Sequence, residues 1–315
     1  MTVTDEPAIA ALPSRRARSR ALTWFWPHGA ALTVIAALAA AAYAWRMGND
    51  PLEPYYEASV RSMSTSAQDF LYGAFDPTGT LTLDKLPGAL WVQALFVVVF
   101  GFHTWAMVLP QTIEGVLAVV FLYRAVARLG GRTAGVVAAA VLAASPAVVA
   151  LNRGNMGDTL MMLLLVLAAD ATSAAVKSGR GRSLVMAGVW VGLAFQAKTL
   201  QAWLVLPALG LVYLVSGPGA VTRRLRQVTV AGLVTVVVSL SWMSLVSLTP
   251  AGQRPYVDGS TDDSWFQQVF LYNGLNRVGG QTPNQALAGQ GLGGSIAFVP
   301  PRCLTVPPLR RLPGS

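Results

Sequence analysis

Long apolar runs alternate with short polar segments along most of this chain. Hydrophobic residues make up 54% of the 315 positions and charged residues 12%, and the mean hydropathy is +0.51. Each run approaches the roughly 20 apolar residues that a helix needs to cross a bilayer. The pattern therefore predicts an all-α polytopic membrane protein with about seven spans, at residues 29–46, 104–123, 134–151, 158–176, 183–197, 200–216 and 228–247.

Basic residues gather in four clusters between these runs, and they set the expected orientation. Cytoplasmic segments carry an excess of lysine and arginine, so we expect all four clusters in the cytoplasm: Arg15–Arg20; Arg124, Arg128 and Arg132; Lys177, Arg180 and Arg182; Arg223, Arg224 and Arg226. An even number of crossings must then separate neighbouring clusters. This makes the apolar segment 88–101, about 14 residues long, an interfacial or re-entrant helix rather than a span.

This topology divides the chain into parts of different character. We expect a basic cytoplasmic N-terminus (1–28) followed by an uncleaved first helix, because no small-residue cleavage site follows the arginines. A transmembrane domain (29–247) with its first outer loop at 47–103 comes next, and then an extracytoplasmic segment (248–280). The remaining 281–315 has the composition of a disordered or aberrant tail, and the chain looks truncated or read out of frame there.

Charge and cysteine usage exclude several classes of function. The net charge of +9 does not indicate nucleic-acid binding, because the basic residues follow the membrane pattern. The single cysteine, Cys303, excludes an internal disulfide and a Cys-based metal cage. Ten of the 14 acidic residues fall in segments expected outside the plasma membrane. Any chemistry is therefore expected on the extracytoplasmic face.

The densest polar segment is DPTGTLTLDKLPGALW, from Asp76 to Trp91. Its carboxylates, Asp76 and Asp84, could act as a general base toward an acceptor hydroxyl or help to hold a divalent cation. Lys85 is a point-charge partner for phosphate. The alternative is a solvated loop whose charges keep the next helix at the interface, and the spacing alone does not decide between these interpretations.

Two further outer turns carry isolated charges. Arg153 and Asp158, in NRGNMGD, would lie near the outer interface, where charged residues are costly and usually paired or functional. Arg153 suits a lipid phosphate, and a mutual Arg153–Asp158 ion pair is an equal alternative. Lys198 is the only charge in AFQAKTLQAW, beside Gln201, and either binds phosphate or snorkels. The presence of Arg153 on the same side favours phosphate.

Acidic and aromatic residues also follow the first run directly. Asp50, Glu53 and Glu57 are either catalytic or solvated charges next to the membrane, and the solvated interpretation is favoured for Glu53. Tyr55 and Tyr56 are typical of the aromatic belt at a membrane interface.

Taken in order, these segments resemble the GT-C membrane glycosyltransferases, in particular glycosyltransferase family 39 with its protein O-mannosyltransferase-like and aminoarabinose-transferase-like members. The resemblance covers about residues 29–280. It rests on YYEASVRSM, FDPTGTLTLDKLPGALW, NRGNMGD, GLAFQAKTLQAW and RPYVDGSTDDS. Three features depart from the family pattern. Leu86 and Gly157 stand where prolines are typical, and Asp50 and Glu53 differ in local pattern from the Asp-Glu pair that many relatives carry after the first helix.

The resemblance implies a GT-C-type transmembrane helix bundle with interfacial helices in the first outer loop. It also implies a polyprenyl-phosphate sugar donor, a lipid, glycan or protein acceptor, and in some members a divalent metal. Carried over to this chain, the catalytic acids are Asp84 and Asp76, either of which would also be the metal ligand. The residues that bind the donor phosphate are Lys85, Arg153 and Lys198, and the supporting residues are Asp158, Tyr56 and Gln201.

Two other functions stay open at this point. A transporter or non-enzymatic lipid-binding protein would place polar residues near mid-span along a path, whereas most charges here lie at the outer ends of the runs. An inactive truncated fragment is the other alternative, and it rests on the composition of the tail.

Overall fold

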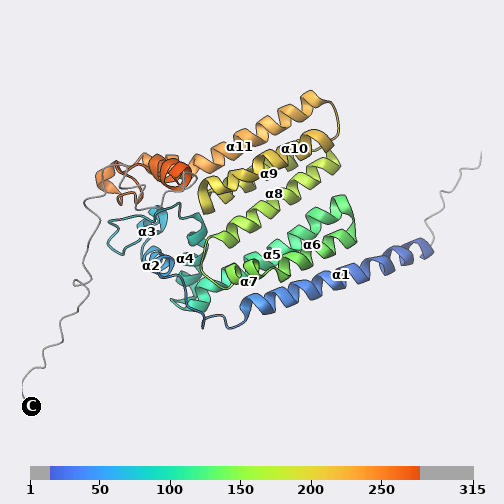
Figure 1. The fold of residues 1–315 in the computed structure, drawn as a ribbon, viewed down its shortest axis with the longest axis horizontal. Helices are drawn as coiled ribbons and strands as arrows, with labels where there is room; N and C mark the ends of the chain where they lie inside the picture. Colours follow the sequence, from blue (N-terminus) through green and yellow to red (C-terminus); the bar gives the residue numbers. More distant parts are fainter. Residues whose placement is uncertain (1–14, 277–315) are drawn as a thin grey trace, which may run out of the picture.

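The computed structural model of the 315-residue chain describes residues 15–276, with side chains from residue 29 onward. The expected tail at 281–315 and residues 1–14 of the N-terminal segment 1–28 lie outside this range. The described part is built from helices and loops (Figure 1): α1 (Arg15–Ala44), α2 (Pro54–Met63), α3 (Ala67–Tyr72), α4 (Gly88–Phe100), α5 (Thr104–Gly130), α6 (Arg132–Ala144), α7 (Pro146–Asn152), α8 (Asp158–Ser178), α9 (Gly181–Lys198), η1 (Thr199–Val205), α10 (Leu206–Ser216), α11 (Val221–Ser247), η2 (Ala251–Gln253) and η3 (Gln267–Leu275).

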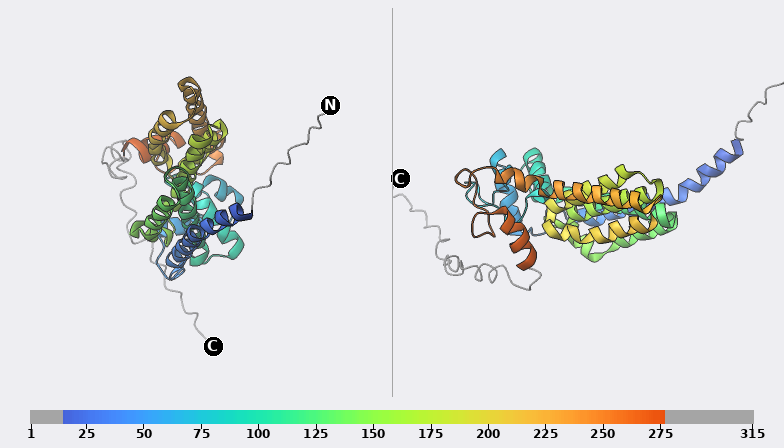
Figure 2. Two further views of the ribbon diagram at one scale, coloured as in Figure 1. Left: turned by 90° about the vertical axis from the view of Figure 1, so that its right-hand side faces the viewer. Right: turned by 90° about the horizontal axis from the view of Figure 1, so that it is seen from above.

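Long helices lie side by side in a bundle, and the polar loops gather at one end of it, which we call the loop end (Figures 1 and 2). The loop end contains α2, α3, α4 and the segment after α11. Four helical runs in the described residues are long and apolar enough to cross a membrane: Thr104–Gly130, Asp158–Ser178, Gly181–Ser216 and Val221–Ser247. A fifth is added if α6 and α7 count as one span.

The first apolar run, expected as a span at 29–46, forms the second half of α1. The rest of the expected set differs from the runs in two places. The run expected at 134–151 is bent by 61° between α6 and α7, because Pro146 cannot supply a backbone N–H inside a continuous helix. The two runs expected at 183–197 and 200–216 follow each other without a loop in one stretch of helical residues, Gly181–Ser216.

That stretch folds back on itself at Thr199, whose φ of 49° lies in the left-handed region. At one end of the bundle, Tyr213 donates a hydrogen bond to Gln227 at 2.5 Å, and a Cβ on Gly181 would lie 2.9 Å from the same Gln227 side chain. On a straight helix, residues 181 and 213 would be about 48 Å apart at 1.5 Å per residue. α9 and α10 therefore run in opposite directions, which gives two passes through the bundle.

The segment between α1 and α5 folds into three short helices with local start and stop signals. Glu53 caps α2, with its side chain accepting a hydrogen bond from the Tyr56 N–H at 2.9 Å. Ser66 and Asp69 cap α3 by exchanging hydrogen bonds, and Gly73 ends it with a φ of 64°. α4 begins after Pro87, and it is the short apolar helix expected at 88–101.

The segment that follows α11 docks onto this first outer loop, which the sequence did not predict. Thr82 donates a backbone hydrogen bond to Tyr256 at 2.9 Å, and Tyr256 donates one to Thr80 at 2.9 Å. The indole N–H groups of Trp91 and Trp242 donate to the carbonyls of Phe70 and Leu71, at 2.7 and 3.0 Å. Segments far apart in the chain are thus joined by direct hydrogen bonds at the loop end.

Candidate functional site

Asp84 and Lys85 form a partly buried ion pair immediately before α4. The Lys85 ammonium lies 3.3 Å from the Asp84 carboxylate, and the two side chains are 21% and 19% exposed. Lys85 also donates a hydrogen bond to the Tyr56 hydroxyl at 2.7 Å and lies over that ring. Burial alone would lower the pKa of Lys85, but Asp84 and the Tyr56 hydroxyl raise it overall. Lys85 therefore stays a cation at this position.

Two segments distant in the sequence hold the backbone around Asp84. Its N–H donates to the Tyr55 hydroxyl at 2.7 Å, and its carbonyl accepts from Asn273 at 2.6 Å. The carbonyl of Leu83, one residue earlier, accepts from Gln268 at 2.6 Å. Groups from α2 and η3 thus fix the loop that carries the predicted catalytic acid.

A second carboxylate, Asp258, joins this group, and the sequence analysis did not select it. The Asp258 N–H donates to the Thr82 hydroxyl at 3.1 Å. Burial raises the pKa of Asp258, and the negative charge of Asp84 raises it further. Burial and the charges of Asp84 and Asp258 also raise the pKa of Tyr55. The phrase VDGSTDD was the only sequence signal for this residue, and nothing in it indicated that it packs against Asp84.

Asp76 lies elsewhere in the same loop and serves its own turn. Its carboxylate accepts hydrogen bonds from the Thr80 hydroxyl at 2.8 Å, the Leu81 N–H at 2.9 Å and the Thr78 N–H at 3.0 Å. Burial alone would raise the pKa of Asp76, but hydrogen bonds from Thr78, Leu81 and Thr80 lower it to about 2. This geometry is typical of a carboxylate that shapes a loop rather than one that accepts a proton near neutral pH.

The three predicted motifs meet where α4 begins. A Cβ on Gly88 would lie only 2.5 Å from the carbonyl oxygen of Gln196, just before Lys198. A Cβ on Gly157 would lie 2.7 Å from the Cβ of Ala89 and 3.5 Å from the carbonyl of Ala197. The start of α4 therefore packs directly against the turn before α8 and the end of α9.

The two positions that lack the family's prolines fit this packing. Gly157, in place of proline, allows the close approach of Ala89. Leu86, in place of proline, is 2% exposed and belongs to the apolar cluster that includes Phe195 and Trp242.

The charged residues of the two outer turns do not form the Arg153–Asp158 ion pair that the sequence offered as an alternative. Lys198 forms an ion pair with Asp158, and Arg153 forms one with Asp50. The Arg153–Asp158 pair is absent from the structure because Asn155 ties this turn to the start of α2. The Asn155 side-chain amide accepts a hydrogen bond from the Glu53 N–H at 2.9 Å and donates one to the Glu53 carbonyl at 3.1 Å.

The two other predicted supporting residues, Tyr56 and Gln201, lie in different surroundings. Tyr56 contacts Lys85 directly. Gln201 is exposed on η1, whereas the neighbouring Gln196 is buried and donates to the carbonyls of Val238 and Ser239.

A divalent metal would have few protein ligands here. Within residues 29–276, no group of three or more His, Cys, Asp or Glu side chains lies close enough together to hold a metal ion. Asp84 and Asp258 supply two carboxylates, and Lys85 already pairs with Asp84. Mg²⁺ is often held by one or two carboxylates with substrate phosphate oxygens, so this donor set fits a metal only when a substrate completes it.

Comparison with known proteins identifies relatives for this arrangement. Residues 84–244 match the family described as dolichyl-phosphate-mannose-protein mannosyltransferase. Two proteins of Bacillus subtilis (strain 168), named as candidate mannosyltransferases, are similar over most of this chain. YycA is 38% identical over 238 residues, 76% of this chain and 35% of its own length. YkcB is 36% identical over 233 residues, 74% of this chain and 32% of its own length. The chain thus spans about a third of the length of these relatives.

A solved structure shares the fold. The Archaeoglobus fulgidus oligosaccharyltransferase, tethered to an acceptor peptide containing the NVT sequon, superposes with a TM-score of 0.54 at 16% identity. The match covers 86% of this chain and 38% of the oligosaccharyltransferase. The predicted GT-C-type helical fold is therefore confirmed.

Proposed function

This chain belongs to the dolichyl-phosphate-mannose-protein mannosyltransferase family, and from that membership we propose that it acts as a membrane glycosyltransferase. The proposed donor is a polyprenyl-phosphate sugar, and the proposed acceptor is a hydroxyl of a lipid, glycan or protein outside the plasma membrane. The loop end of the bundle is the proposed extracytoplasmic face, with the N-terminus in the cytoplasm.

The observation that carries this proposal is the pairing of Asp84 with Lys85 at the start of α4. Glycosyl transfer from a lipid phosphate needs a base for the acceptor hydroxyl and a cation for the phosphate. The two groups lie side by side, at the end of the bundle where Lys198 also emerges. They are partly buried, so charges there interact more strongly than in open water.

We assign Asp84 the role of general base. The acceptor oxygen forms a bond to the anomeric carbon of the sugar while the bond from that carbon to the phosphate oxygen breaks. The proton of the acceptor hydroxyl passes to the Asp84 carboxylate, and the polyprenyl phosphate leaves with its charge balanced by Lys85. Asp76 is not assigned this step, because hydrogen bonds from its own loop already hold its carboxylate.

The remaining cations are proposed to help bind the donor phosphate. Lys198 follows Gln196 and Ala197, whose carbonyls pack against the start of α4, so it is the proposed second contact. Arg153 lines a separate cavity with Asp50, Pro146 and Val149, and the planar guanidinium suits a phosphate bidentately. Each cation is paired with an aspartate, and a phosphate would have to compete with that carboxylate.

A transfer assay tests the proposal. The purified chain in proteoliposomes is given radiolabelled polyprenyl-phosphate mannose, with lipid, oligosaccharide and serine- or threonine-containing peptide acceptors supplied in turn. We expect Asp84→Asn to lower turnover by about 100-fold or more, as for loss of a general base, and Lys85→Ala to weaken donor binding. Asp262→Asn, which changes an exposed acid of the loop end, is the matched control.

Two outcomes would contradict different parts of the proposal. Full turnover in both Asp84→Asn and Lys85→Ala would overturn the site. A wild-type chain that neither binds the donor lipid nor transfers its sugar would overturn the function.

A further inference from the structure

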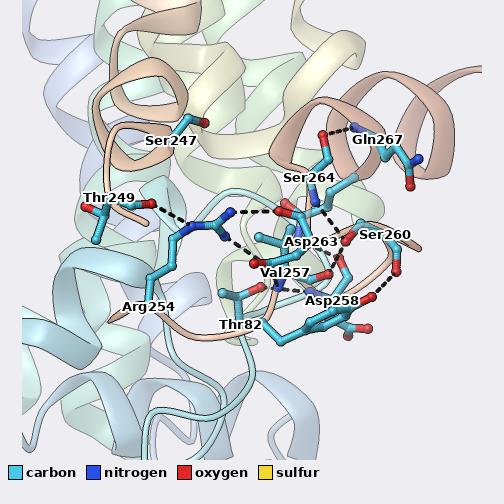
Figure 3. Close-up of polar contacts among 12 residues, drawn as sticks. Thr82, Ser247, Thr249, Arg254, Val257, Asp258, Ser260, Asp263, Ser264 and Gln267 are labelled. Carbon is cyan, nitrogen blue, oxygen red and sulfur yellow. Dashed lines mark hydrogen bonds and ion pairs between the residues drawn. The ribbon is translucent and has the colours of Figure 1, made fainter. Parts of the chain in front are cut away.

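The loop between η2 and η3 is closed by a buried ion pair (Figure 3). Arg254 donates to the Asp263 carboxylate at 3.0 Å and to the Asp263 carbonyl at 2.8 Å. A third donor group of Arg254 reaches the Thr249 carbonyl at 3.2 Å. The Asp263 carboxylate also accepts from the Val257 N–H at 2.8 Å. We call residues 254–264 the clamped loop.

Two residues of the clamped loop adopt left-handed backbone conformations. Asp263 has a φ of 59°, which is uncommon for a residue with a side chain. Gly259 has a φ of 75°, and a Cβ there would lie 2.8 Å from the Tyr272 ring. Such conformations persist only where the surrounding contacts determine them, and they gather at functional sites.

Residues outside the clamped loop hold the backbone of Asp258 on both sides. The Asp258 N–H donates to the Thr82 hydroxyl, and its carbonyl accepts from Gln268 at 2.8 Å. The same Gln268 amide donates to the carbonyl of Leu83, next to Asp84. One side chain therefore links the backbones that carry the two acids.

We propose that Asp258 binds a hydroxyl group of the donor sugar. This proposal rests on the function proposed above. One carboxylate oxygen of Asp258 accepts from the Gly259 N–H at 2.8 Å, which orients the group. A carboxylate fixed in this way is a suitable acceptor for a sugar hydroxyl.

The position of Lys85 is the reason for choosing the donor sugar. The sugar is bonded directly to the phosphate, so a phosphate held at Lys85 places the ring against the groups beside Lys85. Asp84 pairs with Lys85 directly, and Asp84 in turn acts electrostatically on Tyr55 and Asp258. Since Asp84 is assigned to the acceptor hydroxyl, Asp258 is the second carboxylate available to the ring.

Burial and the charge of Asp84 raise the pKa of Asp258. Asp258 and Tyr272 also act electrostatically on Tyr55, and a Cβ on Gly259 would lie 2.8 Å from the Tyr272 ring. A bound hydroxyl would supply a hydrogen bond that compensates for this burial.

A binding experiment separates the sugar from the rest of the donor. The dissociation constants of polyprenyl-phosphate mannose and of bare polyprenyl phosphate are measured with the whole chain in nanodiscs, by tryptophan fluorescence. We expect Asp258→Asn to raise the dissociation constant of polyprenyl-phosphate mannose about tenfold and to leave that of bare polyprenyl phosphate unchanged. Asp262→Asn should change neither dissociation constant, and Lys85→Ala should raise both.

Asp258→Ser is measured in parallel, because it removes the carboxylate and keeps an acceptor for the Gly259 N–H. Equal affinity of wild type and both Asp258 variants for the mannose lipid would overturn the inference while leaving the proposed function standing. An equal loss of affinity for both lipids in these variants would also overturn the inference. A wild-type chain with no affinity for either lipid would overturn the proposed function, and this inference with it.

Discussion

Asn273 donates a hydrogen bond from its side-chain amide to the backbone carbonyl of Asp84, 2.6 Å away and 189 positions earlier in the chain. The same amide donates to the carbonyl of Gln268 at 3.0 Å. The first outer loop and the segment after α11 are therefore one structural unit at the loop end. The position of the proposed base depends on a residue that lies beyond the last long helix.

Replacing Asn273 by alanine should loosen the loop that carries Asp84. A hydrogen bond of this kind contributes about 1 kcal/mol, so we expect roughly fivefold faster hydrogen exchange in residues 80–86. Transfer should fall by a similar factor. Gln253→Ala, at an exposed position of the same segment, is the control. Exchange equal to wild type in Asn273→Ala would show that the contact does not hold Asp84.

Asp76 should stabilise the first outer loop at neutral pH and lose this effect in acid. Its pKa is lowered from 3.8 to about 2 by hydrogen bonds from its own turn. A carboxyl group with a depressed folded pKa contributes stability above its unfolded pKa, and the contribution disappears as pH falls through the folded pKa. Because Asp76 is only partly buried, solvent screening leaves roughly 1 kcal/mol at pH 7.

Thermal unfolding of wild type and Asp76→Asn tests this from pH 7 to pH 2. The difference in melting temperature between the two proteins should be constant near neutral pH. It should disappear as the pH falls from about 4 to 2. Transfer at pH 7 should survive in Asp76→Asn, since that residue is not the proposed base. A loss as large as that of Asp84→Asn would reverse the assignment of the two acids.

The order of apolar runs could be predicted from the sequence because each run is a local feature. The short helix α4 was also predicted, since 13 apolar residues are too few for a span. The neighbourhood of Asp84 could not be predicted in the same way. It depends on the pairing of Thr82 with Tyr256, which forms only when distant segments fold together. Spacing along the chain contains no information on that pairing.

The ion pairs at the loop end illustrate the same limit. Sequence proximity made an ion pair between Arg153 and Asp158, five positions apart, an equal alternative to phosphate binding. The structure pairs Arg153 with Asp50 instead, because the Asn155 side chain fastens the turn to the backbone of Glu53. A local pattern gives the charges that are present, and tertiary contacts decide their partners.

Gly88 should tolerate no side chain. A Cβ there would lie 2.5 Å from the backbone oxygen of Gln196 and 2.7 Å from its carbonyl carbon, so α4 or α9 would have to move. We expect Gly88→Ala to cost roughly 1–3 kcal/mol, as for overpacking of a filled core, and to lower both melting temperature and transfer. Gly252→Ala is the control, because nothing lies within 4 Å of its Cβ position. Equal melting temperatures for the two variants would contradict this packing.

The proposed orientation places residues 80 and 180 on opposite sides of the membrane. In a Cys303→Ser background, Thr80→Cys and Arg180→Cys are both at exposed positions of the structure. A membrane-impermeant maleimide should label position 80 in intact cells and position 180 only after permeabilisation. Leu95→Cys, on the exposed face of α4, should label weakly if that helix lies in the interface. Labelling of 80 and 180 from one side would contradict the topology.

The Arg254–Asp263 pair should decide whether the clamped loop keeps its shape. The two side chains are only 9% and 15% exposed, and removing one partner of a buried pair costs about 3–5 kcal/mol. Arg254→Leu should therefore increase hydrogen exchange in residues 254–264. It should also weaken binding of polyprenyl-phosphate mannose, as Asp258→Asn does. Asp263→Asn should have a smaller effect, because the amide oxygen still accepts from Val257. An Arg254→Leu protein with an unchanged loop and unchanged lipid binding would show that the clamp does not position Asp258.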